Sequence, residues 1–327
     1  RRMPLLAIAL TALSVLALQV SLTRVFSLLI WYHFAFLAIA MALLGFTGGG
    51  VIVQLRPSVR EGDVDARMAK LSLAAAGSVV AALTVASRLP FGASVLESPG
   101  QFACFVALLA VVLVPFLLSG VVIAAVLSSY GASAATLYAA DLVGSGVGCA
   151  LSVLALDHLG GGAGAMVASA AVMALASLAF ARRSEAFRPR GTALAVASAA
   201  ALVGLTAWGS DPLNGPFYLP NAKLFPRVQK SAIYSRRCDS TACVDLFRNP
   251  GHLGIWGLSR RYNLPAPTQV GVVIDAWALT SIFEAQRRPD GTPELRHPVF
   301  EMLLPSFAHL VDRARSFRPR RMLIIGT

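Results

Sequence analysis

Charged residues are scarce in this chain of 327 residues. Asp, Glu, Lys and Arg make up 13% of the sequence, whereas soluble domains carry about 25%. Hydrophobic residues reach 56% and the mean hydropathy is +0.69, so an ordinary soluble fold is excluded for much of the chain. The net charge of +12 comes without a basic stripe of interleaved aromatic residues, which argues against nucleic acid as a partner. Basic loops beside membrane spans are the simpler explanation of the excess.

Cysteine is also rare, with four residues in the whole chain. Cys104 and Cys149 lie within apolar runs, where we expect them to pack as small hydrophobic side chains. Cys238 and Cys243 lie five residues apart in a polar segment and can pair as a disulfide. Two cysteines alone do not make a zinc site, so no metal ion is expected.

Long apolar runs fill the part of the chain before Gly209. A helix needs about 20 apolar residues to cross the hydrocarbon core of a membrane, and seven runs are long enough, although Thr23 and Arg24 interrupt the first near its end. We therefore predict a multi-pass transmembrane domain over residues 1–209, an all-α bundle in a lipid bilayer. The expected spans are Met3–Ile30, Trp31–Leu55, Leu71–Ser87, Phe102–Ser129, Ala134–Leu156, Ala163–Ala181 and Thr192–Trp208.

The loop charges predict an orientation. The segments Arg56–Lys70 and Arg182–Arg190 each hold four basic residues. Both follow even-numbered spans and so lie on one face of the membrane, and an excess of Lys and Arg marks the cytoplasmic face. The N-terminus is then expected inside. After seven spans the C-terminal region is expected to emerge outside.

Ionisable side chains within the spans are candidate functional residues. Asp141 lies mid-span, where a carboxylate costs about 3 kcal/mol on insertion scales, so we expect it to face the bundle interior or a water-filled cavity. It is either a substrate, proton or ion contact or a hydrogen-bonded structural brace. Arg24 and His33, with Trp31 and Tyr32 beside His33, form an expected interfacial cluster, and His33 is also a candidate binding residue.

Glycine and proline predict how the spans pack. Gly144 and Gly148 make a G-x-x-x-G pair, as do Gly45 and Gly49, and this spacing lets helix backbones approach closely. Pro115 predicts a kink within the fourth span.

The composition of the sequence changes after Trp208, where the long apolar runs end. Turn-forming residues from Asp211 to Pro216 mark a linker, and short strand-like runs follow. These predict a small mixed or antiparallel β unit over residues 210–320. The candidate strands are Val228–Tyr234, Ala242–Phe247 and Val270–Ile274, with a helix over Val299–Phe317.

The last residues resemble the start of a nucleotide-binding fold. Met322–Ile325 is a continuous apolar run of the kind found in fully buried parallel strands, and Gly326 follows directly, where such folds make their first turn. A buried central strand needs partners for its backbone groups. We therefore expect the chain to be a fragment in which residues 321–327 begin a truncated Rossmann-like domain.

Three stretches make the chain resemble membrane-bound members of the spermidine synthase family, in which a multi-span region precedes an aminopropyltransferase-like domain. The resemblance spans nearly the whole chain. The first stretch holds Leu22, Arg24, Trp31, Tyr32, His33, Gly45, Gly48, Gly49 and Gly50. The second holds Pro115–Gly120 and Leu137–Gly144, and the third holds Val273–Ala276, Phe300–Leu303 and Met322–Gly326.

The resemblance implies a β-rich synthase-like unit followed by a Rossmann-like domain, in a bacterial inner membrane protein. It implies that the full-length form transfers an aminopropyl group from decarboxylated S-adenosylmethionine to a small-molecule amine. Gly326 matches the cofactor-binding turn, and the catalytic residues are expected beyond Thr327. Asp275 and Glu301 match positions near the substrate, although Asp275 can equally cap a turn and Glu301 can be a solvated helix residue.

The chain departs from the family pattern at two places. Ala276 replaces a glycine after Asp275, and Val299–Phe300 replaces the Tyr-His of polyamine synthases. The second departure removes polar groups expected near the amine and weakens the case for putrescine as the acceptor. Two alternatives stay open. One is a membrane transporter-like protein with an accessory domain, and the other is a membrane-tethered methyltransferase that uses S-adenosylmethionine. This fragment alone is expected to be inactive.

Overall fold

The computed structural model describes residues 4–89, 98–219, 230–248, 269–283, 286–287 and 293–294. The chain divides into two compact units. The first comprises Arg1–Leu224 together with the short segment Arg237–Cys243, and the second comprises Phe225–Arg236 and Val244–Thr327. Expected features at Val299–Phe317, Glu301, Met322–Ile325 and Gly326 lie outside the described residues.

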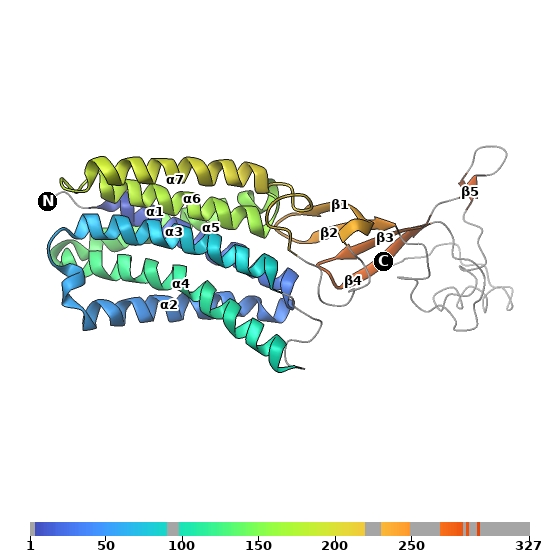
Figure 1. Cartoon of the computed structure of the whole chain (residues 1–327), viewed down its shortest axis with the longest axis horizontal. Coiled ribbons are helices and arrows are strands. Elements are labelled where there is room, and N and C mark those ends of the chain that lie inside the picture. Colours follow the sequence, from blue (N-terminus) through green and yellow to red (C-terminus); the bar gives the residue numbers. More distant parts are fainter. Residues whose placement is uncertain are drawn as a thin grey trace, which may run out of the picture. The chain divides into compact units, whose positions relative to one another are not determined.

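The first unit contains the seven long helices that the sequence predicts, and Figure 1 shows them as a bundle. Each is long and apolar enough to cross a membrane, so the seven-span prediction is confirmed. The helices are α1 (Leu5–Leu29), α2 (Ala35–Leu55), α3 (Val64–Arg88), α4 (Pro99–Ser129), α5 (Ala134–His158), α6 (Gly162–Ala181) and α7 (Arg188–Gly209).

Helix α1 lies within two residues of its predicted bounds and continues through Thr23 and Arg24, where the Thr23 hydroxyl donates a 2.7 Å hydrogen bond to the Val20 carbonyl. The starts of α2, α3, α4 and α7 differ from the prediction by three residues or more. Helix α2 begins at Ala35, after the 3-10 helix Tyr32–Phe34. Helix α3 begins at Val64, since the carboxylate of Asp63 accepts a 2.9 Å hydrogen bond from the Ala66 N–H and caps the first turn. Helix α7 begins at Arg188, with a proline in its first turn, where proline is well tolerated.

Helix α4 is not interrupted by its proline. It continues through Pro115 as one helix, and Figure 1 shows it curving along its length. The Ser119 hydroxyl donates a 2.7 Å hydrogen bond to the Pro115 carbonyl, which is one of the local contacts that membrane helices use around proline.

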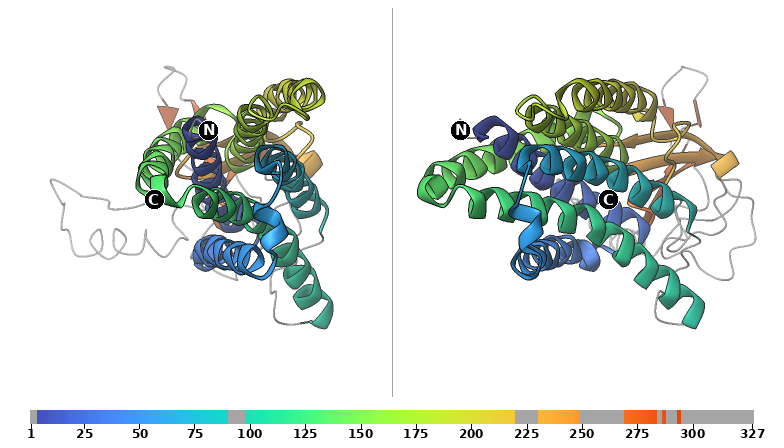
Figure 2. Two further views of the ribbon diagram at one scale, coloured as in Figure 1. Left: turned by 90° about the vertical axis from the view of Figure 1, so that its left-hand side faces the viewer. Right: turned by 60° about the vertical axis from the view of Figure 1, so that its left-hand side comes forward.

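Helices α1 and α6 are the most buried of the seven, and the left view of Figure 2 looks at the bundle from its end. Helix α1 packs against α5, α6 and α2, while α6 packs against α3 and α7, and α2 packs against α4. Two interhelical hydrogen bonds of 2.7 Å join these helices: Ser14 on α1 donates to the Ser169 carbonyl, and Ser177 on α6 donates to the Ala69 carbonyl. Side-chain to backbone bonds of this kind stabilise helix association in lipid.

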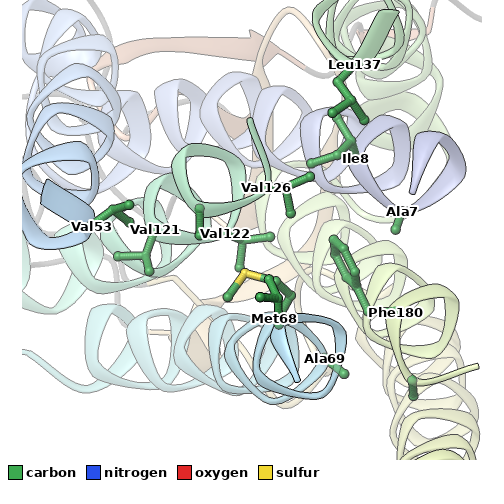
Figure 3. Packing of buried hydrophobic residues seen from close by; sticks show 13 residues of the cluster. Ala7, Ile8, Val53, Met68, Ala69, Val121, Val122, Val126, Leu137 and Phe180 are labelled. Carbon is green, nitrogen blue, oxygen red and sulfur yellow. The ribbon is translucent and has the colours of Figure 1, made fainter. Parts of the chain in front are cut away.

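An apolar core lies toward the end of the bundle where α1 begins. Ile8, Met68, Val122, Leu137 and Phe180 are fully buried there and come from five different helices, namely α1, α3, α4, α5 and α6. Figure 3 shows Met68 beside Val122 and Phe180 beside Ala7 and Val126. The core therefore ties most of the bundle together in one layer of side chains.

The glycine pairs lie where helix backbones come closest. A Cβ atom added to Gly144 would lie 2.2 Å from the Ala9 carbonyl oxygen, and one added to Gly148 would lie 2.5 Å from the Leu13 carbonyl oxygen. On α2, a Cβ atom at Gly49 would lie 2.5 Å from the Gly120 carbonyl carbon of α4. The prediction of close glycine packing is therefore confirmed for both helix pairs.

A four-stranded antiparallel sheet with the order β1-β2-β3-β4 follows the helices. In its register Leu246 pairs with Val272, and Val272 pairs with Thr280. The described residues also contain a two-stranded antiparallel ribbon. The strands are β1 (Ile233–Cys238), β2 (Cys243–Arg248), β3 (Gln269–Ile274), β4 (Ala278–Phe283), β5 (Gln286–Arg287) and β6 (Pro293–Glu294).

The strand predictions succeed in part. Strands β2 and β3 lie within one residue of their predicted bounds. The prediction for the first strand, Val228–Tyr234, is wrong at both ends, because Lys230–Ala232 is a short 3-10 helix and β1 runs from Ile233 to Cys238. Strand β4 was not expected. Its residues alternate between the two faces of the sheet after a two-residue turn, and that pattern is a sequence signal for a hairpin.

Candidate functional site

The sequence-predicted candidates within the described residues lie on separate elements. Asp141 is on α5 and Arg24 is on α1, and these helices run parallel because Ala9 lies beside Gly144 and Leu13 beside Gly148. Asp141 is thus level with the start of α1, whereas Arg24 lies fifteen residues beyond Ala9, about 22 Å further along the axis. The two side chains do not form one intramembrane site.

Asp141 lies on the face of α5 that packs against α1. It follows Leu137 by four residues and precedes Gly144 by three, and both are buried, so all three share one helix face. The Asp141 side chain is half-buried, while the flanking Tyr138 and Leu142 are exposed. No hydrogen bond or ion pair joins its carboxylate to another residue of the described ranges. A structural brace would need such a partner, so the described residues do not support that interpretation.

The end of the bundle at which α3 begins carries a polar network that sequence reasoning missed. The Arg183 Nε donates a 3.1 Å hydrogen bond to the Asp65 Oδ1, and another guanidinium nitrogen of Arg183 donates to the Tyr130 hydroxyl at 3.2 Å. The Ser184 hydroxyl donates to the Asp63 Oδ2 at 2.5 Å. This network joins the ends of α3, α4 and α6. Its sequence signal was Asp63 and Asp65, two of the three acidic residues in the predicted loop Arg56–Lys70.

At the opposite end, the β1–β2 turn lies against the connection between α5 and α6. Gly160 and Gly161 have positive φ values, and a Cβ atom at Gly161 would lie 2.5 Å from the Cβ of Cys238. The Ser240 N–H donates a 2.8 Å hydrogen bond to the Asp157 Oδ1. Glycine is needed here because the backbone is left-handed and the turn approaches closely.

A disulfide closes this turn. Cys238 and Cys243 are bonded, which is the pairing that their spacing allowed. Between them, hydrogen bonds hold the pKa of the Asp239 carboxyl below its usual range. The largest contribution comes from the Thr241 hydroxyl, followed by the N–H groups of Ala242 and Thr241. The positive charge of Arg24 lowers this pKa further, so the arginine of the expected interfacial cluster acts on this turn.

The remaining candidates of the first unit are exposed or lipid-facing. His33 lies in the 3-10 helix Tyr32–Phe34, where its ring is exposed and lies beside the Tyr32 ring, with 3.8 Å between ring centroids and 49° between ring planes. The burial predicted for the unpaired cysteines is wrong for Cys149, which is exposed on α5, while Cys104 is half-buried. In the ranges that the structure describes, no three His, Cys, Asp or Glu side chains gather in a position to hold a metal ion.

The sheet contains a buried ion pair that sequence reasoning also missed. The Arg236 guanidinium on β1 makes two hydrogen bonds to the Asp245 carboxylate on β2, with Nε to Oδ1 at 2.5 Å and a second nitrogen to Oδ2 at 2.8 Å. The two side chains are 1% and 2% exposed. Arg236 and Asp245 are spaced symmetrically about the same turn as the disulfide. A hairpin prediction centred on that turn would have paired them.

Asp275 lies in the tight turn between β3 and β4. Asp275 and Ala276 have φ values of 49° and 59°, and the Trp277 N–H donates a 3.0 Å hydrogen bond to the Ile274 carbonyl. Two consecutive left-handed residues match the type I′ hairpin turn, which favours Asp-Gly. Ala276 therefore occupies the second of these positions, where glycine is favoured. The turn-forming role considered for Asp275 fits this geometry.

Replacing Ala276 by valine is expected to lower the free energy of unfolding of the sheet by about 3 kcal/mol, because a β-branched residue is strained at positive φ and the site is tightly buried. Ala276→Gly is the matched control and should stay within about 1 kcal/mol of the parent, since relief of strain offsets the lost methyl group. Urea unfolding of the full chain in detergent, followed by tryptophan fluorescence, measures both. Equal stability of the two variants would contradict the turn geometry.

Comparison of the chain with family models, with curated proteins and with solved structures finds no match.

Proposed function

We propose that this chain is the membrane anchor and first β unit of an aminopropyltransferase-like protein of a bacterial inner membrane. The observation that supports the proposal is the antiparallel sheet that follows the seven helices. Its β3–β4 turn carries Asp275 and Ala276 where the family resemblance has Asp-Gly. A β-rich unit in this place is what precedes the Rossmann-like domain in the resembled enzymes.

The proposed chemistry is a nucleophilic substitution on decarboxylated S-adenosylmethionine. A neutral amine nitrogen attacks the propyl carbon beside the sulfonium, a new C–N bond forms, and the C–S bond breaks to release methylthioadenosine. A carboxylate accepts the proton that the amine loses. Asp275 and Glu301 are the acidic residues that this chain would contribute near the amine, and Gly326 would belong to the cofactor-binding turn.

Isothermal calorimetry on the full-length protein tests the proposal. Heat of binding with decarboxylated S-adenosylmethionine, together with aminopropylated amine as product, is the expected result. Heat with S-adenosylmethionine alone would favour the methyltransferase alternative instead. No heat with either compound would contradict both enzyme functions.

Asp141 and the loop charges favour a second candidate, a membrane transporter-like protein with an accessory domain. An ionisable residue within a span is a functional-site hypothesis by default, and Asp141 has no partner among the described residues. The basic segments Arg56–Lys70 and Arg182–Arg190 flank one end of the bundle, whereas α7 ends at the other. The Cys238–Cys243 disulfide belongs to the class of bonds that persist in oxidising compartments. The loop charges and the disulfide both favour an extracytoplasmic position of the sheet. Decarboxylated S-adenosylmethionine, the donor that the enzyme would use, is cytoplasmic.

Cysteine labelling of the full chain in intact cells separates the two candidates. Asn214→Cys places an exposed thiol after α7, and Ser58→Cys places one in the exposed loop between α2 and α3 as the control for the opposite face. The parent chain reports the background from Cys104 and Cys149. If a membrane-impermeant maleimide labels the Asn214 variant in intact cells but the Ser58 variant only after lysis, the sheet is outside and the transporter-like function is favoured. If it labels the Ser58 variant in intact cells but the Asn214 variant only after lysis, the sheet is cytoplasmic, as the enzyme requires.

A further inference from the structure

A groove runs along the outside of the bundle where the first turns of α1 lie beside the last turns of α6. Its volume of about 390 Å³ falls within the range of about 300–1,000 Å³ that is typical of ligand sites. Leu6 is 67% exposed and Leu175 is 41% exposed, so both walls open toward the surroundings of the bundle, which in a membrane are lipid. Its lining includes Leu5, Leu6 and Leu10 of α1 together with Leu175, Arg182 and Arg183 at the end of α6.

The groove is amphipathic along its length. Leucines and alanines of both helices line its floor and walls, and Arg182 and Arg183 close the end at which α6 finishes. If an alkyl chain lies along the apolar part of the groove, a polar headgroup attached to it lies at the level of the Arg182 and Arg183 guanidinium groups. This is the arrangement of a phospholipid at the boundary between hydrocarbon and headgroups, where arginine is favoured.

The two arginines differ in what they have available for a ligand. Arg183 is engaged within the protein, because it binds the Asp65 carboxylate and the Tyr130 hydroxyl. The Arg182 side chain is exposed, and within the described part of the chain no hydrogen bond or ion pair engages its guanidinium. Arg183 therefore builds the wall of the groove, and Arg182 presents an open set of donors that suits phosphate oxygens.

The electrostatic surroundings also favour an anion. Residues 182–190 contain four arginines against the single acidic residue Glu185. The end of α6 itself carries a partial negative charge, so the attraction comes from the guanidinium groups and not from the helix. Basic pockets between membrane helices on the positively charged side are typical binding sites for anionic lipid headgroups.

We infer that this groove binds one anionic phospholipid, with an acyl chain between α1 and α6 and its phosphate on the guanidinium group of Arg182. The site does not depend on the proposed function of the chain. It lies in the leaflet at the basic end of the bundle. Its occupant would fill the space between the two central helices and bridge them.

Native mass spectrometry of the purified full chain in detergent tests the inference. Phosphatidylglycerol should bind as a single saturable adduct, more tightly than phosphatidylcholine. Arg182→Gln should weaken phosphatidylglycerol binding about fivefold, because one arginine near anionic lipid contributes about 1 kcal/mol. Arg190→Gln removes the same charge from the same basic segment without lining the groove, and it should change binding less than about twofold.

A second variant tests the apolar half of the site. Leu175→Trp fills the open side of the groove without removing charge, and it should remove the saturable phosphatidylglycerol adduct. Circular dichroism checks that each variant keeps its helix content. Equal weakening by the Arg182 and Arg190 variants, or unchanged binding in the Leu175 variant, would overturn the inference and indicate non-specific attraction to a basic surface. Binding of inorganic phosphate as tight as that of the lipid would overturn it as well.

Discussion

Replacing Gly144 by alanine is expected to destabilise the helix bundle by about 2–3 kcal/mol. The added methyl carbon would lie 2.2 Å from the Ala9 carbonyl oxygen, which is backbone and cannot rotate away. Helices α1 and α5 would have to separate, and the packing that brings Gly148 against Leu13 would loosen with them. In lipid, close packing of this kind is a main source of helix association.

The same helix supplies a matched control. A Cβ atom at Gly146 has no neighbour within 4 Å, so Gly146→Ala adds the same methyl group to the lipid-facing side. This variant should be unchanged or more stable by up to about 1 kcal/mol, because alanine has the higher helix propensity. Thermal unfolding in detergent, followed by circular dichroism, compares the two. Similar midpoints for both variants would show that α1 and α5 do not pack as closely as the structure describes.

The spans could be predicted from the sequence because the signal for a membrane helix is cumulative over about 20 residues. Individual polar residues such as Thr23 and Arg24 do not break a helix whose backbone bonds are satisfied internally, so the predicted first span extends through both of them. The start of α3, in contrast, was missed. Its first turns are polar, and its boundary is set by the Asp63 cap rather than by hydropathy.

The sheet was predicted less well because a strand signal is short. Strands β2 and β3 carry dense β-branched and aromatic residues, whereas β4 is recognisable only once the turn at Asp275 is known. The Gly144 pair was identified from spacing alone. Its partner, Ala9 on α1, could not be identified in this way, because the spacing within one helix does not say which helix lies opposite.

For the candidate functional residues too, the sequence identifies the residue but not its surroundings. Asp141 was singled out because an ionisable residue in a span is conspicuous in the sequence. Whether the Asp141 carboxylate has a hydrogen-bond partner in the described ranges depends on which faces of the neighbouring helices pack against it. A single sequence does not contain that information. Arg182 attracted attention only as one of several loop charges, and its position at the end of an apolar groove emerges from the packing of α1 against α6.

Removing one partner of the buried ion pair in the sheet is expected to have the largest effect of any single change in the β unit. The Arg236 and Asp245 side chains are 1% and 2% exposed, so Asp245→Leu would leave a guanidinium group buried without its carboxylate. Such an uncompensated charge lowers the free energy of unfolding by about 3–5 kcal/mol. Arg236→Met should have a comparable effect, because it leaves the carboxylate without its two hydrogen bonds.

The double variant Arg236→Met/Asp245→Leu tests whether the loss comes from the charge or from the shape of the site. Two apolar side chains of similar volume remove both desolvation penalties, and replacements of this kind are often neutral or stabilising by about 1–4 kcal/mol. The double variant should therefore be more stable than either single variant, although it removes more of the native contacts. Urea unfolding of the full chain, with the Cys238–Cys243 disulfide kept oxidised, measures all four proteins of the cycle. Additive losses in the double variant would mean that the two side chains are not energetically coupled, and the bidentate pairing across β1 and β2 would then not hold this hairpin together.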